Sequence, residues 1–150
     1  MWTFVKLTFL KIRYSQRLTQ FLILISFVIT FGIARLITHS QKAGIIPNQQ
    51  GNLHIHHLVP GILLLLISGF AGLSFWSKKQ LRWIMSIFFG IGAALTIDEF
   101  ALWLRLEDVY WTKQGRDSID AIIIAIVLLI IMLLISEAHD HSLIKKLIKR

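Results

Sequence analysis

Four long blocks of hydrophobic residues, separated by shorter polar stretches, set the pattern of the 150-residue chain. Each block approaches the roughly 20 mostly apolar residues that an α-helix needs to cross the hydrocarbon core of a bilayer. The pattern therefore predicts four membrane spans, with approximate ranges 19–38, 58–76, 81–104 and 119–136. We expect an all-α fold, an integral-membrane four-helix bundle that forms a single domain over the whole chain.

Composition narrows the classes of protein and of site. Hydrophobic residues make up 55% of the chain, and its formal net charge is +8. Because the basic residues gather beside the apolar blocks, we interpret them as contacts for membrane lipids and not for nucleic acid. The chain contains no cysteine, so any metal site must use nitrogen and oxygen ligands.

The distribution of lysine and arginine predicts the orientation in the membrane. Three stretches hold eleven of the sixteen basic residues: Lys6, Lys11, Arg13 and Arg17; Lys78, Lys79 and Arg82; Lys145, Lys146, Lys149 and Arg150. The bias of basic residues towards the cytoplasmic side predicts that both termini lie in the cytoplasm. The connections 39–57 and 105–118 then lie outside. The basic N-terminal arm and C-terminal tail are expected to be amphipathic segments on the cytoplasmic leaflet.

Three histidines, His54, His56 and His57, stand immediately before the second predicted span. In an extended segment His54 and His56 point the same way, and in a helix His54 and His57 share a face. Either geometry offers two imidazole ligands to a metal such as zinc or iron. The alternative is that they are ordinary interfacial side chains ahead of Pro60, a residue suited to the first turn of a helix.

Two adjacent acids, Asp98 and Glu99, lie inside the third predicted span, near its outer end. A carboxylate below the membrane surface is costly and normally faces protein, water or a cation. Adjacent helical residues diverge by about 100°, so both acids can reach one small site only if the helix is locally distorted. We therefore expect one of them to be the ligand or base. The alternative role for Asp98 is an ion pair with Arg105, which shares its helical stripe.

Local signals also mark the fourth span and the contact between the second and third. Asp117 is expected to cap the fourth helix, and Asp120 to face the polar layer. The small-residue spacing from Gly90 to Ala94 predicts tight packing between the second and third helices.

Four motifs carry most of the polar residues of the apolar region. They are HIHHLVPGILLLLISG at 54–69, FGIGAALTIDEFALWL at 89–104, LEDVYW at 106–111 and GRDSIDAIIIA at 115–125. With Thr38 and His39 after the first span, they resemble a family of small, uncharacterised bacterial integral membrane proteins. The resemblance covers roughly residues 32–127 and implies a multi-pass protein of the bacterial cytoplasmic (inner) membrane, with a polar layer at these motifs. It implies no activity, substrate or cofactor.

Two classes of function are open. In the first, an outward-facing His/Asp/Glu layer binds a divalent metal (zinc, iron or manganese) and acts on a lipid or another amphiphile at the interface. The candidate ligands are His54, His56, His57, Asp98 and Glu99, and the candidate catalytic residues are Asp98, Glu99 and Arg105.

The second class is a non-enzymatic small transporter or an accessory subunit, which works as a homo-oligomer or with a partner membrane protein. The inner half of every predicted span is essentially apolar. This argues against a continuous ion path and favours an interfacial site.

Overall fold

The computed structural model describes residues 2–46, 56–75, 77–106 and 116–148, and the side chains of those that lie between 17 and 136. Within these ranges the regular structure is entirely helical, which confirms the all-α class. The helices are α1 (Trp2–Lys42), α2 (Leu58–Ser74), α3 (Lys79–Asp98), α4 (Phe100–Arg105) and α5 (Arg116–Ile148). Three helical stretches are long and apolar enough to cross a membrane, Arg17–Lys42, Lys79–Asp98 and Arg116–Ser136, and α2 is a shorter apolar helix.

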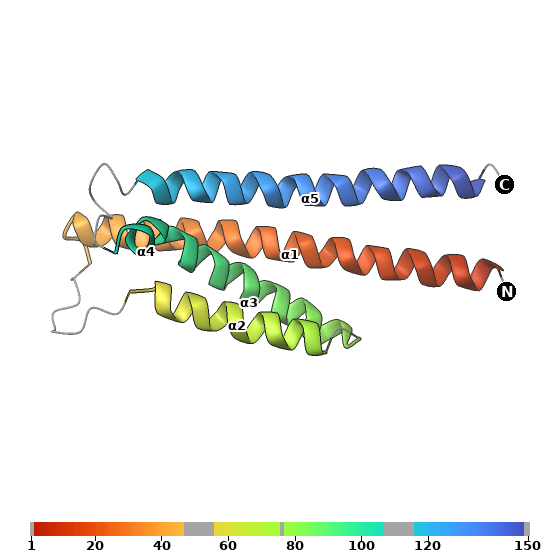
Figure 1. The fold of residues 1–150 in the computed structure, drawn as a ribbon, viewed down its shortest axis with the longest axis horizontal. Helices are drawn as coiled ribbons and strands as arrows, with labels where there is room; N and C mark the ends of the chain where they lie inside the picture. Colours follow the sequence, from red (N-terminus) through yellow and green to blue (C-terminus); the bar gives the residue numbers. More distant parts are fainter. Residues whose placement is uncertain (1, 47–55, 76, 107–115, 149–150) are drawn as a thin grey trace.

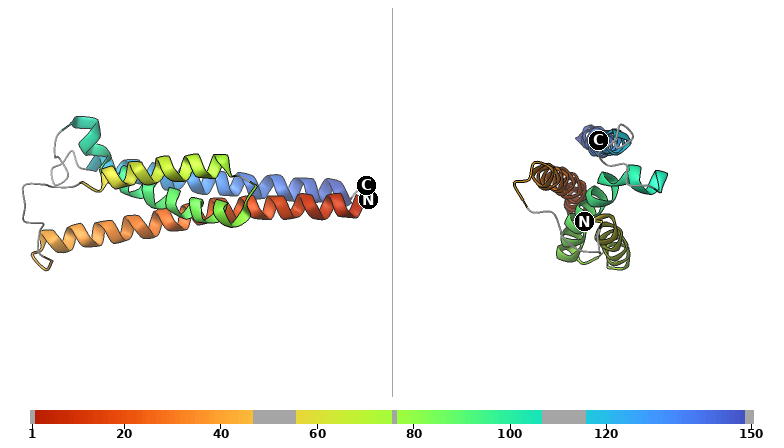
Figure 2. Two further views of the ribbon diagram at one scale, coloured as in Figure 1. Left: turned by 90° about the horizontal axis from the view of Figure 1, so that it is seen from below. Right: turned by 90° about the vertical axis from the view of Figure 1, so that its left-hand side faces the viewer.

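The two long helices, α1 and α5, extend together past α2 and α3, so both termini lie at the end of the molecule opposite α4 (Figures 1 and 2). We expected the basic arm and the tail to be separate segments on the leaflet. Instead α1 continues unbroken for 41 residues and α5 for 33. Neither extension contains a glycine or proline that would end the helix. At 1.5 Å per residue, α1 is roughly 60 Å long, about twice the thickness of a hydrocarbon core.

The central element of the bundle is α3, which packs between α1 and α2. A Cβ added to Gly92 would lie 2.8 Å from Gly61 O on α2, and one added to Gly61 would lie 2.7 Å from Thr96 Oγ1 on α3. The predicted tight contact between these two helices is therefore present. However, Gly90 faces α1, where a Cβ would meet Ser26 Oγ and lie 2.5 Å from Ile23 O. The two glycines bring α3 close to two different helices.

The small hydrophobic core lies where α5 completes the bundle. It consists of Phe27 on α1, Ala94 on α3 and Ile122 on α5, each at most 1% exposed. Most other large apolar side chains remain exposed, among them Leu73 at 81%. Such an apolar outer surface is expected of helices that contact lipid.

The third predicted span differs from the single helix that we expected over residues 81–104. The helix ends at Asp98, turns at Glu99 (φ −100°, ψ 22°) and resumes as α4. The short α4 runs across the long axis of the molecule (Figure 2). The interruption falls at the pair of acids on which the functional predictions depend.

Candidate functional site

A polar cluster gathers at the α4 end of the molecule, where the last turns of α1, the start of α2 and the end of α3 meet (Figure 1). Its members are Arg35, His56, His57, Asp98 and Glu99, which are joined by ion pairs between three elements. The structure thus brings two of the three predicted histidines to both predicted acids.

The carboxylate of Asp98 is fully buried and is engaged on both oxygens. Its Oδ1 lies 2.6 Å from Arg35 Nε on α1. Its Oδ2 lies 3.0 Å from His57 Nε2, at the N-cap position of α2. Asp98 therefore ties α1 and the start of α2 to the end of α3.

The carboxylate of Glu99 is only 5% exposed and reaches the same histidines from the next residue along the chain. Its Oε2 accepts the backbone N–H of Leu58 at 2.8 Å. Its Oε1 lies 3.2 Å from His56 Nδ1 and 3.5 Å from His57 Nδ1. One carboxylate oxygen thus faces two ring nitrogens.

The turn at Glu99 explains how adjacent acids serve one site. In a continuous helix their side chains would diverge by about 100°, so we expected both acids to reach one small site only if the helix is locally distorted. Because α3 ends at Asp98 and α4 begins at Phe100, the backbone changes direction between the two side chains. Both acids therefore contact the histidines, through the local distortion that this convergence requires. That only one of them is the ligand or base stays a prediction.

The charges of the cluster do not balance when both imidazoles are neutral. Arg35 contributes one positive charge, and Asp98 and Glu99 contribute two negative charges. Burial lowers the pKa of His57, but its hydrogen bond with Asp98 and the charges of Glu99 and Asp98 outweigh burial and the opposing charge of Arg35. The pKa of His57 is consequently raised above its ordinary 6.5, because its neighbours favour an added positive charge.

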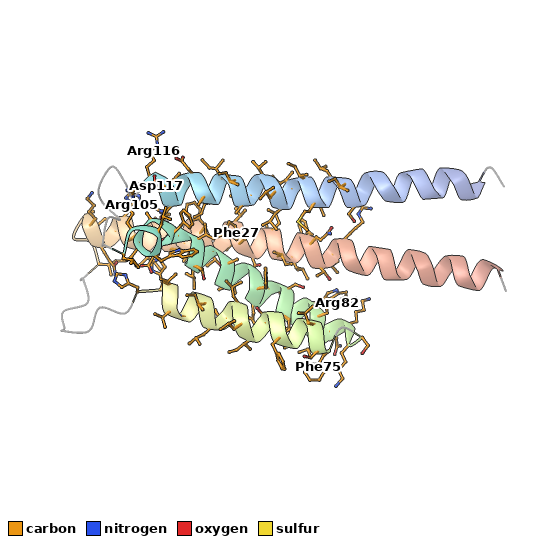
Figure 3. The ribbon with its side chains drawn as sticks, in the orientation of Figure 1. Phe27, Phe75, Arg82, Arg105, Arg116 and Asp117 are labelled. Carbon is orange, nitrogen blue, oxygen red and sulfur yellow. The ribbon has the colours of Figure 1, made fainter. Side chains whose placement is uncertain are left out.

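Beside the cluster, α4 is attached to the first turn of α5. The backbone N–H of Ala101 donates to Ser118 Oγ at 3.0 Å. At the other end of α4, Arg105 donates to Asp117 Oδ2 from Nε at 3.1 Å (Figure 3). Arg105 thus pairs with Asp117 and Asp98 pairs with Arg35, in place of the Asp98–Arg105 ion pair that was the alternative role for Asp98. Asp117 lies inside the first turn of α5, which begins at Arg116, and not at the cap position where we expected it.

Several predicted residues lie elsewhere, and two important ones were missed. His54 falls outside the described residues, and Asp120 is exposed on α5. Arg35 and Ser118 were not among the predicted site residues. Arg35 carried a usable signal, because it is an ionisable residue inside the first predicted span. Ser118 carried none, because serine near a helix start is most simply a local cap.

The described part of the chain contains no group of three or more His, Asp or Glu side chains whose arrangement could hold a metal ion. The chain matches no protein-family model, no curated protein and no solved structure. Arguments about function therefore rest on the geometry of the polar cluster.

Proposed function

We propose that the chain is a membrane protein whose polar cluster binds a divalent cation at one membrane interface and uses it to act on a lipid or another amphiphile. The observation that carries the proposal is the position of Glu99 Oε1, which lies 3.2 Å from His56 Nδ1 and 3.5 Å from His57 Nδ1. Neighbouring ligand atoms around a tetrahedral zinc ion, with bonds of about 2.0–2.1 Å, are roughly 3.3 Å apart. These two spacings therefore suit ligands of a common ion.

A bound cation would also compensate the net negative charge of the cluster. With neutral imidazoles the cluster is one positive charge short, and uncompensated charge is costly in poorly hydrated surroundings. Two histidines and one carboxylate, with a position left open, are typical of catalytic zinc and non-haem iron sites. Such an ion supplies an activated water at neutral pH. Because no described group of side chains has the arrangement of a complete metal site, binding requires the imidazoles of His56 and His57 to rotate about their side-chain bonds.

The other two members of the cluster then orient a ligand. Asp98 Oδ2 lies 3.0 Å from His57 Nε2, so a proton on Nε2 would leave the Nδ1 lone pair available to a cation, and Arg35 contacts the opposite oxygen of Asp98. A carboxylate behind a ligating imidazole selects its tautomer and raises its basicity. We assign Asp98 this orienting role and Glu99 the ligand role.

We place the cluster on the outer side of a bacterial cytoplasmic membrane, with α2 as the fourth span and both termini inside. The common end reached by α1 and α5 supports a shared side for the termini (Figure 1). The basic Lys78, Lys79 and Arg82 lie at the end of the α2–α3 hairpin that is away from the cluster, which supports the same orientation.

The metal content of detergent-purified protein tests the proposal. We would expose wild type to zinc, iron(II) or manganese, remove unbound ions and count bound metal by mass spectrometry. Wild type should retain roughly one ion per chain, and His56→Ala and Glu99→Ala should lose it. Asp98→Asn should weaken binding roughly 10- to 100-fold, as expected when an orienting carboxylate is lost.

Two controls separate loss of a ligand from loss of the fold. Glu99→Gln keeps the side-chain volume and an oxygen for the Leu58 N–H, so this folded variant should still lose the metal. His141→Ala removes a histidine from the far end of α5 and should bind like wild type. A folded wild type that retains none of the three metals contradicts the proposal.

A non-enzymatic role is the second candidate, and one observation favours it. Protein groups already contact all four carboxylate oxygens of Asp98 and Glu99. Such a network is suited to holding three helices in register in an accessory subunit. This role predicts a metal-free wild type in which His56→Ala lowers the free energy of unfolding.

A further inference from the structure

The interruption between α3 and α4 needs hydrogen-bond acceptors for the start of α4. The first N–H groups of a helix have no partner within it. The carbonyl oxygen of Glu99 accepts the N–H of Leu102 at 3.0 Å, which accounts for one of these groups. The N–H of Ala101 turns instead towards another helix.

That acceptor comes from α5. Ser118 Oγ lies 3.0 Å from the Ala101 nitrogen, and both residues are only 1% exposed. A buried N–H that loses its partner costs much more than an exposed one, because water does not replace the lost acceptor. Ser118 thus caps α4 from a distant part of the chain, although it lies in the first turn of its own helix.

We infer that Ser118 is a positioning residue for the polar cluster. By fixing the start of α4, its hydroxyl holds the turn at Glu99, and this turn directs the Glu99 carboxylate to the histidines beside Asp98. The inference rests on the proposed function only for its consequence, which is that Ser118 sets the metal affinity. Its structural claim, that a hydroxyl on α5 places Glu99, stands without a metal.

The chain provides a direct readout on the opposite side of the turn. The N–H of Leu58 donates to Glu99 Oε2 at 2.8 Å, so its protection from hydrogen exchange reports where the Glu99 carboxylate lies. The N–H of Ala101 reports the cap itself. If the cap acts only on α4, its loss changes the exchange of the Ala101 amide and leaves that of the Leu58 amide unchanged.

The experiment compares Ser118→Ala with wild type and Ser118→Thr by residue-resolved hydrogen exchange in detergent, in the presence of a chelator. In the alanine variant the amides of Ala101 and Leu58 should both exchange roughly tenfold faster, as expected for the loss of one buried hydrogen bond. The threonine variant keeps the hydroxyl and should restore protection of Leu58. The amide of Phe75, bonded to Ala71 O at the far end of α2, should not change.

Faster exchange at Ala101 with unchanged exchange at Leu58 overturns the inference. If Ser118→Ala does not fold, Ser118→Cys is judged by the same two amides, since it has nearly the same volume and a weaker acceptor. A subsequent zinc titration separates the two proposals. A wild type that binds no metal but shows the expected exchange pattern contradicts the proposed function alone, whereas metal binding with an unresponsive Leu58 contradicts this inference alone.

Discussion

The middle of α3 and its end at the polar cluster are held to their neighbours by opposite means. In the middle, Gly90 and Gly92 let the backbones of α1 and α2 approach closely, and no charge is involved. At the end, Asp98 and Glu99 reach the same two neighbours through ion pairs, and the helix is interrupted between them. The same helix therefore uses close packing in one half and buried charge in the other.

The difference indicates which region reflects a function. Close packing of small residues is the usual way in which membrane helices associate. Buried ion pairs carry a desolvation cost that often equals their attraction, so they are weak evidence for stability. The middle of α3 is explained by packing alone, whereas the charges at its end call for a role beyond packing.

The largest effect is expected from breaking the buried pair on one side. Asp98→Ala leaves the charge of Arg35 without its carboxylate and should lower the free energy of unfolding by about 3–5 kcal/mol. Replacing both residues, as in Arg35→Leu with Asp98→Leu, should recover most of that loss, because neither member of the pair is then left buried without the other. Unfolding in mixed micelles titrated with sodium dodecyl sulfate measures both. A double variant as unstable as Asp98→Ala would show that the charges are needed for the fold.

The next effect concerns the middle of the helix. Gly90→Ala places a methyl group against Ser26 Oγ and 2.5 Å from Ile23 O, so it should cost about 1–3 kcal/mol of stability. Gly69→Ala in α2 is the matched control, because its Cβ would have nothing within 4 Å. That change should be neutral, or should stabilise by up to about 1 kcal/mol through helix propensity. Equal effects in the same unfolding measurement would contradict the close approach of α1 and α3.

A smaller effect should appear with pH in protein freed of metal. The pKa of His57 is raised in the folded state by Asp98 and Glu99, against burial and Arg35. Its protonation therefore adds stability that is fully present below the ordinary value of 6.5 and is lost as pH rises through the folded value. The free energy of unfolding should fall as the pH rises above the ordinary value of 6.5 in wild type, and fall less in His57→Gln. Parallel profiles for the two proteins would contradict the assignment.

The sequence predicted what depends on local composition. Apolar runs predicted the all-α class, and the predicted topology put His56 and His57 on the same side as Asp98 and Glu99, which the structure brings together. The turn at Glu99 was beyond this reasoning, because the run from Glu99 to Arg105 contains no glycine or proline. Its cause is tertiary, in the acceptor that α5 offers to α4 and the donor that Leu58 offers to Glu99.

The ion-pair partner of Asp98 was likewise not predictable from the sequence. Sequence spacing identifies possible contacts only between residues of the same helix, so Arg105 was the candidate ion-pair partner of Asp98. The observed partner, Arg35, lies on α1, more than sixty positions away in sequence. Which charges meet across helices depends on how the glycines set the packing of α1 against α3, and a hydropathy pattern does not encode that registry.

The smallest effect is expected at the second arginine–aspartate pair, which repeats the chemistry of the first with different burial. The side chains of Arg105 and Asp117 are 42% and 34% exposed, whereas that of Asp98 is fully buried. Arg105→Ala should therefore cost only about 0.2–1 kcal/mol. Raising the salt concentration from about 0.05 M to about 0.5 M should abolish that cost and leave the loss in Asp98→Ala nearly intact, because mobile ions screen exposed charges far better than buried ones. If salt relieved both losses equally, the Arg35–Asp98 pair would be open to solvent, and the argument that its charges need a role beyond packing would fail.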